Sequence, residues 1–312
     1  MQPKIAIILL NYNGKKDTLE CLASLENLEY TNYEVIVVDN GSKDGSTLTI
    51  SKAYPHITLI ETHKNLGFSE GNNVGIRYAL KKSFDYFFLL NNDTIIDPTN
   101  LTSFVKAAEE NPEGGIFGAK IFRYYEKDTI DHFGGLWNQT TADFDVVGLG
   151  KKDIGFNQYK QVDYICGCAF FITKEVIEKI GLLEPSFFLI WEDTDYCYKA
   201  KKAGFSLISV PDAKIYHKVS SSFTGGKPQM HYFWWRGRLL WLQRNRKVLS
   251  TPYRYSLFVE VFKLFRHFAV KSLVFPFSTK AKREKRRLRL KRYKAGIRGI
   301  LHFCLGKFGN TY

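Results

Sequence analysis

The sequence predicts an α/β fold with a mainly parallel central sheet flanked by helices, followed by a helical, basic C-terminal tail. Three observations lead to this prediction. Short apolar runs alternate with polar helical stretches through the first half of the 312 residues, as in βαβ units. The first run, residues 5–10, is continuously aliphatic, as expected of a strand buried on both faces. After Gly225 and Gly226 the composition becomes aromatic and basic, which sets the tail apart.

The expected elements follow in chain order. Strands are predicted at residues 5–10, 34–38, 58–60, 86–90, 169–172 and 207–210. A helix is predicted from about Asp17, with Asp17 and Glu20 forming a capping box, and another from about Glu70 to Lys82. We expect residues 1–98 and 99–250 to be two halves of one domain and residues 251–312 to be the tail.

Polar residues follow three of these predicted strands, at Tyr12-Asn13, Asp39-Asn40-Gly41 and Asn91-Asn92-Asp93. Because the carboxyl ends of parallel strands share one edge of a sheet, these residues are expected to converge on one crevice. A carboxylate such as Asp39 can accept the N3–H of a uracil or thymine ring. The chain carries neither GxGxxG after its first strand nor GxxxxGK[ST], so no Rossmann cofactor site or P-loop is predicted.

The Asn91-Asn92-Asp93 cluster suits a metal site. A carboxylate at that position can hold Mg²⁺ or Mn²⁺, with phosphate oxygens and water as further ligands. A diphosphate leaving group needs such a cation because negative charge builds on it. Asn and Asp are also common turn residues, so a plain β-turn is the alternative interpretation.

A second acidic cluster, Glu192, Asp193 and Asp195, follows an apolar run. Three carboxylates in four positions repel one another, which suggests a use such as a general base. The alternative is that the acids occupy the first turn of a helix running to Lys202. His217 follows a strand-like run and is either a packed residue or a metal ligand.

The five cysteines are scattered and form no CxxC pair, which favours buried free thiols in a reducing compartment over disulfides or structural zinc. The apolar run at the N-terminus is too short for a signal sequence, so a cytoplasmic location is expected.

The tail is amphipathic and then strongly basic. Residues 257–277 contain five charged or His positions, which exclude a membrane span. On a helix, one face would carry Phe258, Val261, Phe262, Phe265, Phe268, Ala269 and Leu273. From Lys280 to Arg298, eleven Lys and Arg residues stand against Glu284, a charge of +10 out of the net +14. We expect residues 257–298 to lie on an anionic membrane surface. The alternatives are a nucleic-acid-binding arm and a packed helix with a solvated charged face. Between membrane and nucleic acid we favour the membrane, so no nucleic-acid partner is expected.

Taken in order, these motifs resemble glycosyltransferase family 2, of GT-A fold, and most of all its bacterial rhamnosyltransferase-like branch. The matching pieces are Leu10-Asn11-Tyr12-Asn13-Gly14, Val37-Val38-Asp39-Asn40-Gly41-Ser42, Asn65-Leu66-Gly67-Phe68-Ser69, Gly71-Asn72-Asn73, Leu89-Leu90-Asn91-Asn92-Asp93, Gly167, Ala169-Phe170-Phe171, Trp191-Glu192-Asp193, Asp195 and His217. They cover about residues 4–245.

The resemblance assigns roles to individual residues. Tyr12 and Asp39 would hold the nucleoside base, and Asn13, Asn72 and Asn92 would lie near the donor. Residues 1–98 would then be the nucleotide-sugar-binding half.

Asp93 matches the last acid of the family's DxD motif and would ligate the metal, with His217 as an additional ligand. Asn91 stands where the family has its first Asp, so this ligand would be a neutral amide oxygen.

Within the acceptor-binding and catalytic half, residues 99–250, Asp193 would be the base and Glu192 a positioning or acceptor-binding residue. Trp191 and Trp235 would offer flat apolar surfaces to the acceptor. For Arg236 and Arg238 we hypothesise phosphate contact, with ordinary surface charge as the alternative.

The implied reaction is inverting transfer of a sugar, with rhamnose as the candidate, from a dTDP- or UDP-linked donor to a hydroxyl of a cell-surface glycan or lipid-linked acceptor. It would take place in the cytoplasm, on the inner face of the membrane. A sugar-phosphate nucleotidyltransferase would carry a Gly-rich, Arg- or Lys-bearing loop after the first strand, which residues 11–16 do not supply. A catalytically inactive nucleotide- or carbohydrate-binding module is the other alternative.

Overall fold

The computed structural model describes residues 2–141, 143–218, 227–245, 251–276 and 280–312. Within them the chain divides into two compact units. Unit 1 comprises Met1–Trp137, Phe144–Glu184 and Asp193–Ser220. Unit 2 comprises Asn138–Asp143, Pro185–Glu192 and Ser221–Tyr312.

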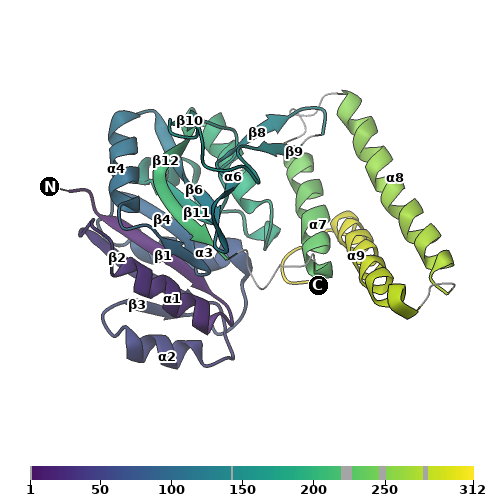
Figure 1. Ribbon diagram of the computed structural model, residues 1–312, viewed down its shortest axis with the longest axis horizontal. Helices are drawn as coiled ribbons and strands as arrows, with labels where there is room; N and C mark the ends of the chain where they lie inside the picture. Colours follow the sequence, from purple (N-terminus) through teal and green to yellow (C-terminus); the bar gives the residue numbers. More distant parts are fainter. Residues whose placement is uncertain (1, 142, 219–226, 246–250, 277–279) are drawn as a thin grey trace. The chain divides into compact units, whose positions relative to one another are not determined.

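A large mixed sheet forms the centre of unit 1 (Figure 1). Its strands are β1 (Ile5–Asn11), β2 (Tyr33–Asp39), β3 (Thr58–Glu61), β4 (Tyr86–Asn91), β5 (Thr94–Ile96), β6 (Gly114–Arg123), β7 (Glu126–His132), β10 (Lys160–Gln161), β11 (Ala169–Thr173) and β12 (Ser206–His217). The order is β10-β12-β6-β11-β4-β1-β2-β3, with β5 beside β12 and β7 beside β6. The pairs within β3-β2-β1-β4 are parallel, as predicted, while β11 runs antiparallel between β4 and β6.

Helices cover both faces of this sheet (Figure 1). They are α1 (Lys15–Leu25), α2 (Ser46–Ala53), α3 (Gly67–Ala79), α4 (Asn100–Glu110), α5 (Lys174–Ile180) and α6 (Glu192–Lys202), with the 3₁₀ turn η1 (Pro185–Phe187) assigned to unit 2. Alternate residues of β1 enter different cores: Ile7 packs with Leu22 and Phe104, whereas Ile8 packs with Ile76. The prediction that the first strand is buried on both faces is therefore confirmed.

Helix starts differ from the predicted ones. α1 begins at Lys15 without a side-chain cap, so the predicted capping box is wrong. Asp17 and Glu20 instead both pair with Lys218, which lies far along the chain and which no local pattern reveals. α3 begins three residues before the predicted Glu70, because the Asn65 Oδ1 accepts the Gly67 N–H (2.9 Å) and turns the chain earlier.

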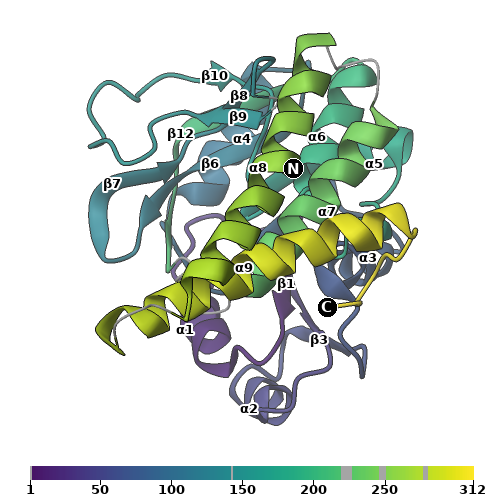
Figure 2. The same ribbon diagram turned by 90° about the vertical axis from the view of Figure 1, so that its right-hand side faces the viewer.

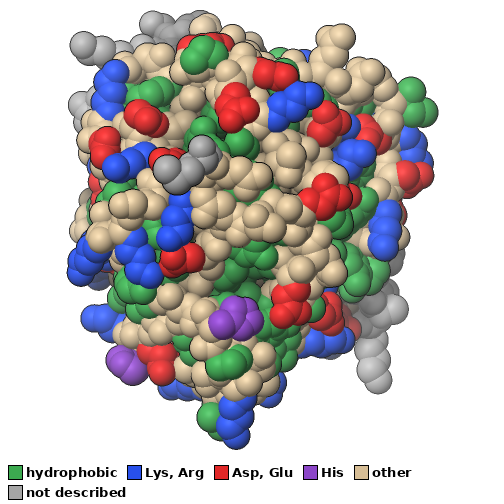
Figure 3. Space-filling model, turned by 90° about the vertical axis from the view of Figure 1, so that its left-hand side faces the viewer, with side chains coloured by type: hydrophobic (Ala, Val, Ile, Leu, Met, Phe, Trp, Pro, Cys, Tyr) green, Lys and Arg blue, Asp and Glu red, His purple; other side chains and the backbone are tan. Residues whose placement is uncertain are grey.

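Two further strands, β8 (Gly135–Asn138) and β9 (Asp143–Val146), pair with each other and lie outside the predicted strands. On the face of the molecule in Figure 3, acidic and basic side chains are interspersed, without a large patch of one sign.

Unit 2 is mainly helical, with α7 (Pro228–Arg244), α8 (Thr251–Val274) and α9 (Lys280–Cys304). α9 packs against both other helices, and its Tyr293 stacks on His267 of α8 at 6.1 Å between ring centroids (Figures 1 and 2). Among the helices described, none is long and apolar enough to span a bilayer. The basic tail is thus helical, as predicted.

Candidate functional site

The polar residues that follow β1, β2 and β4 meet at one edge of the sheet of unit 1. Asn11 is in register with Asp39, and Leu10 is in register with Asn91. The predicted convergence of these strand ends is therefore confirmed. The antiparallel β11 reaches the same edge, because the Asn91 N–H donates to the Cys168 carbonyl (2.9 Å).

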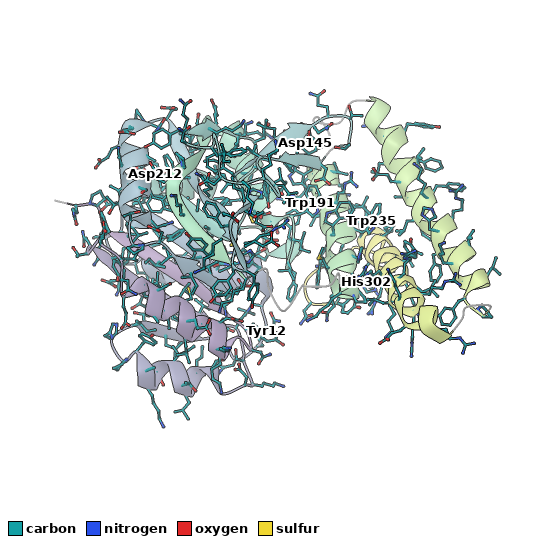
Figure 4. The ribbon with its side chains drawn as sticks, viewed as in Figure 1. Tyr12, Asp145, Trp191, Asp212, Trp235 and His302 are labelled. Carbon is teal, nitrogen blue, oxygen red and sulfur yellow. The ribbon has the colours of Figure 1, made fainter. Side chains whose placement is uncertain are left out.

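Asp39 is buried at this edge, and both of its oxygens already accept hydrogen bonds. One comes from Asn11 Nδ2 (2.7 Å) and one from the Ser42 N–H (2.9 Å). Tyr12, in contrast, is 48% exposed at the end of β1 (Figure 4). Asn13 has a positive φ of 53°, and its Oδ1 accepts the Lys43 N–H at 2.7 Å. The edge thus combines a fixed carboxylate with an exposed aromatic ring.

Asn11 links these strand ends, although the sequence argument gave it no role. Its Oδ1 accepts from Thr18 Oγ1 (2.9 Å), from the Gly14 N–H (3.2 Å) and from Asn92 Nδ2 (3.3 Å). Asn92 Nδ2 also donates to Thr18 Oγ1 (2.8 Å). A Cβ at Gly14 would lie 2.5 Å from Asn92 Nδ2, so only glycine fits there without rearrangement. The signal that could have revealed Asn11 is its position as the last residue of a buried strand.

The loop before α3 is attached to the same edge by Asn40. Asn40 Nδ2 donates to the Gly67 carbonyl (3.0 Å), and its Oδ1 accepts the Leu66 N–H (2.9 Å). Asn72 is buried one turn into α3, where its Nδ2 donates to the Phe68 carbonyl (2.9 Å).

Asp93 and His217 come together from distant parts of the chain. β5 pairs with the end of β12, and His217 Nε2 lies 3.3 Å from Asp93 Oδ1. This nitrogen is buried and has no hydrogen-bond partner within the described residues. The Lys218 N–H donates to the Asp93 carbonyl (3.0 Å), which holds the two residues together.

The third predicted ligand, Asn91, is half-buried, and its side chain makes no hydrogen bond to the part of the chain that the structure describes. In that part, no group of three or more His, Cys, Asp or Glu side chains is arranged to hold a metal ion. Asp93 and His217 are therefore a pair of candidate ligands, which exogenous oxygens would have to complete.

Asp193 lies in the first turn of α6. Its Oδ2 accepts from Tyr164 Oη (2.8 Å) and from the Gly167 N–H (2.9 Å), and its Oδ1 accepts the Thr194 N–H (2.7 Å). Burial raises the pKa of Asp193 above its ordinary value, an effect that outweighs the lowering by these hydrogen bonds. Gly167, which donates to Asp193, directly precedes Cys168. The Cys168 carbonyl accepts the N–H of Asn91, the last residue of β4, so Gly167 lies next to the end of β4.

Tyr164 is a further site residue that sequence reasoning missed. Burial, and then the charge of Asp193, raise the pKa of its phenol well above the usual value, so it remains a hydrogen-bond donor at neutral pH. Asp195, in contrast, pairs with Lys199 at 2.8 Å, as an ordinary i,i+4 helix pair. The acidic cluster is therefore both the start of a helix and a set of distinct carboxylates.

Trp191, Glu192 and Trp235 belong to unit 2, where all three are buried (Figure 4). The ring of Trp191 lies 5.7 Å from that of Trp241, and Trp235 packs on Gly296 of α9. These contacts give both tryptophans a part in the core of unit 2. Their acceptor-binding role and that of Glu192 stay predictions.

The cysteines are free thiols. Cys21, Cys168 and Cys197 are buried as predicted, and burial raises the pKa of Cys21 and Cys166 to about 12, which leaves them protonated and unreactive. Cys304 is exposed, so the prediction of burial is wrong for that residue, which lies at the last position of α9.

Comparison with known proteins places this site in a family. The family model described as glycosyl transferase family 2 matches residues 6–181, more than half of the chain. The hexosyltransferase Agl10 of low-salt glycan biosynthesis in Haloferax volcanii is 27% identical over 66% of the chain, which spans 64% of that relative.

Two relatives are matched over most of their length. The N-acetylglucosaminyl-diphospho-decaprenol L-rhamnosyltransferase of Mycobacterium tuberculosis is 22% identical over 80% of the chain and 92% of its own length. The dTDP-rhamnosyl transferase RfbF of Shigella flexneri is 25% identical over 83% of the chain and 86% of its own length.

Solved structures show the same fold. The mannosyltransferase PcManGT of Pyrobaculum calidifontis, in complex with GDP-Man and Mn²⁺, superposes with a TM-score of 0.60 at 14% identity, over 98% of this chain and 88% of its own. GalNAc-T7 with UDP, GalNAc and Mn²⁺ gives a TM-score of 0.63 at 14% identity, over 98% of this chain and 58% of its own. The chain is similar to rhamnosyltransferases; it has the GT-A fold, belongs to glycosyl transferase family 2 and is a glycosyltransferase.

Proposed function

We propose that this glycosyltransferase moves a sugar, rhamnose first among the candidates, from a nucleotide-diphosphate donor to an acceptor hydroxyl with inversion of configuration. The observation that carries the proposal is the geometry around Asp193. A carboxylate with a raised pKa is held by Tyr164 and Gly167, and Gly167 adjoins the strand end that leads to Asp93. Asp193, the proton acceptor, is thus bonded to this edge of the sheet through Gly167, and Asp93, the candidate metal ligand, lies at the same edge.

The donor would bind on residues 1–98. Asp39, fixed by Asn11 and Ser42, would accept the N3–H of the base, and the exposed ring of Tyr12 would cover it. The same half supplies the polar groups near the donor, Asn13, Asn72 and Asn92. A uracil or thymine base has this N3–H, which supports a UDP or dTDP donor, and RfbF, a relative, is named a dTDP-rhamnosyl transferase.

The residues present fit a divalent cation. Two neighbouring ligands of an octahedral ion, each about 2.1 Å from it, lie about 3 Å apart. Asp93 Oδ1 and His217 Nε2 are 3.3 Å apart, and the nitrogen has no hydrogen-bond partner among the described residues. Asn91 would add a neutral amide oxygen. Mg²⁺ or Mn²⁺ held there would stabilise the negative charge on the departing diphosphate.

Asp193 would accept the proton of the acceptor hydroxyl as that oxygen forms its bond to the anomeric carbon. The bond from this carbon to the diphosphate oxygen breaks in the same displacement, so the electron pair leaves with the nucleoside diphosphate and the configuration inverts. Burial supports this role, since the raised pKa makes Asp193 a stronger base than an ordinary aspartate. Glu192, Trp191 and Trp235 would help to place the acceptor, which would bind on residues 99–250.

Transfer by wild type and by Asp193→Asn tests the proposal. With a dTDP- or UDP-sugar and Mn²⁺, we expect the variant to lose about 10²- to 10⁴-fold in kcat. Stabilisation of the folded chain against heat by the nucleoside diphosphate with Mn²⁺ should be unchanged. Full transfer by the variant would show that Asp193 is not the base. Donor binding without turnover by wild type would indicate an inactive binding module.

We further propose that the enzyme works on an anionic membrane surface, on its cytoplasmic face, through residues 257–298. Exposed side chains at helical spacing form an apolar stripe on α8: Tyr255, Phe258, Phe262, Phe265, Ala269 and Leu273. Phe258 is 68% and Leu273 73% exposed, whereas Val261 and Phe268, expected on the same face, are partly buried. The adjacent α9 supplies the basic residues, which anionic lipid would attract.

Co-sedimentation with phospholipid vesicles tests the membrane proposal. We expect binding to anionic vesicles that weakens at high salt and is reduced by Phe258→Ser with Phe262→Ser. Leu48→Ser removes an equally exposed apolar side chain from unit 1 and should have no effect. Recovery of the wild-type chain in the supernatant with both anionic and zwitterionic vesicles would exclude this surface.

A further inference from the structure

The segment directly before Asp193 is strained. Phe188, Ile190 and Trp191 have positive φ angles of 64°, 67° and 79°. Residues with a Cβ seldom adopt this conformation, which persists only where surrounding structure enforces it. Since the chain passes from this segment straight into α6, the conformation of residues 188–191 sets where the first turn of α6, and with it Asp193, begins.

Helix α7 enforces this conformation through close contacts within unit 2. A Cβ at Gly237 would lie 2.7 Å from the Ile190 carbonyl and 3.1 Å from Trp191 Cδ1, so the segment lies directly against the backbone of α7. The ring of Phe188 stacks on Phe233 at 5.3 Å. The segment is thus packed on one face of one helix.

Arg236 lies at the centre of that face and is fully buried. Its Nη2 donates to the carbonyl of Phe187 (3.1 Å), and Phe187 is the last residue before the strained run. Its Nη1 donates to the Gly309 carbonyl (2.8 Å) and to Thr311 Oγ1 (2.9 Å). The surface-charge interpretation of Arg236 is therefore wrong, and its burial leaves no surface on which to bind a phosphate.

Residues 309–312 are in turn held against α7. Thr311 Oγ1 lies 2.6 Å from Tyr232 Oη, and the ring of Tyr312 lies 5.2 Å from that of Tyr232. A guanidinium stays charged even when buried, and removing it from water is costly unless its N–H groups are paired. Both terminal nitrogens of Arg236 are paired in this way, so Arg236 links the position of the Phe187 carbonyl to that of Gly309 and Thr311.

We propose that Arg236 is a positioning residue for Asp193. Together with residues 309–311 it holds the Phe187 carbonyl and so maintains the strained run that leads into α6. This inference rests on the proposed role of Asp193 as the base. It gives unit 2 a part in the chemistry without any contact between Arg236 and the substrates.

The matched control is Arg238, the other buried arginine of α7, whose burial likewise contradicts both the predicted phosphate contact and the surface-charge alternative. Its Nη1 donates to Glu260 (2.8 Å) and its Nη2 to the Thr141 carbonyl (2.7 Å), both of which lie outside residues 187–191. Arg236→Met and Arg238→Met each remove one buried guanidinium from the same helix. Arg236→Lys and Thr311→Val are milder variants that keep the Arg236 site partly paired and serve if Arg236→Met fails to fold.

Two readouts on the full chain separate positioning from general destabilisation. In Arg236→Met we expect amide hydrogen exchange across residues 187–193 to be about tenfold faster, because local opening becomes easier. We also expect kcat to fall about 10- to 100-fold while the donor KM stays within about threefold, because the base is misplaced and the donor half is intact. Arg238→Met should change neither, and Arg236→Lys and Thr311→Val should lie between.

Equal effects of the two Met variants, or an unchanged exchange rate or kcat in Arg236→Met, would overturn the proposal. The proposal would also be overturned if Arg236→Lys and Thr311→Val changed the exchange rate and kcat no more than Arg238→Met does. Asp193→Asn, measured in parallel, tests separately whether Asp193 is the base. Full transfer by that variant defeats the proposed function, while the exchange rates still report whether Arg236 holds the segment.

Discussion

The regions around Asp93 and Asp193 hold their carboxylates in different ways. Asp93 lies in the turn between β4 and β5, close to His217, and short amides and hydroxyls such as Asn11 and Thr18 stabilise that edge by direct hydrogen bonds. Asp193 follows a strained run whose position depends on contacts deep in unit 2.

The difference matches the two tasks that we propose. A metal ligand needs a fixed oxygen near another ligand, which the end of a strand supplies. A general base needs a raised pKa, which requires burial, and burial is provided by segments from elsewhere in the chain. Variants at each region should therefore fail in different measurements.

The largest effect is expected from Asp93→Asn. Loss of the charged ligand should lower transfer about 10³-fold, because the diphosphate would lose most of its stabilisation by the cation. The measurement is the dependence of transfer rate on Mn²⁺ concentration. A variant with wild-type rate and wild-type Mn²⁺ dependence would rule out a metal on Asp93.

His217→Gln is the companion variant. It keeps a hydrogen-bonding side chain but removes the imidazole nitrogen that faces Asp93. We expect the Mn²⁺ concentration for half-maximal activity to rise about 10- to 100-fold, with little change in kcat at saturating metal. Loss of kcat at every metal concentration, without a shift in the Mn²⁺ dependence, would contradict the assignment of His217 as a ligand.

The sequence predicts the region around Asp93 better than the region around Asp193. Strands β1, β2 and β4 and their terminal polar residues are visible locally, because each apolar run ends at the residue that enters the site. The parallel pairing then places Asn11, Asp39 and Asn91 at one edge without further information.

The rest depends on contacts between residues far apart in the chain. Tyr164 looks like any tyrosine in a loop, and its role comes only from the packing that brings it to Asp193. Arg236 stands in a basic and aromatic run that suggests a surface, yet three segments of unit 2 enclose it. Neither burial nor a positive φ at Trp191 can be read from residue type alone.

Tyr164→Phe should give a smaller, pH-dependent effect. Asp193 acts as a base only when ionised, so kcat rises with pH through the raised pKa of Asp193. The Tyr164 hydroxyl stabilises the ionised form, and its removal raises that pKa further. The acid limb of the pH profile should therefore move to higher pH, while the rate on the alkaline plateau stays near wild type.

The measurement is kcat against pH for both proteins. Wild type itself should show its acid limb above the ordinary range of an aspartate. A limb that moves to lower pH in Tyr164→Phe, or does not move at all, would show that Tyr164 does not control the ionisation of Asp193.

Thr18→Val should have the smallest effect and should be confined to the sheet edge. The substitution keeps the shape of the buried side chain but removes its hydroxyl, which donates to Asn11 and accepts from Asn92. We expect the free energy of unfolding to fall by about 1–3 kcal/mol, because the buried amide of Asn11 and the partly buried amide of Asn92 each lose a partner. Donor KM should rise modestly, while the acid limb set by Asp193 stays in place, since the partners of the Thr18 hydroxyl, Asn11 and Asn92, lie at the sheet edge. Denaturant unfolding, with Thr49→Val as a control at a partly exposed helix position, checks the first effect. A shift of the acid limb in Thr18→Val would show that the two regions are coupled, contrary to the separation argued for Asp93 and Asp193.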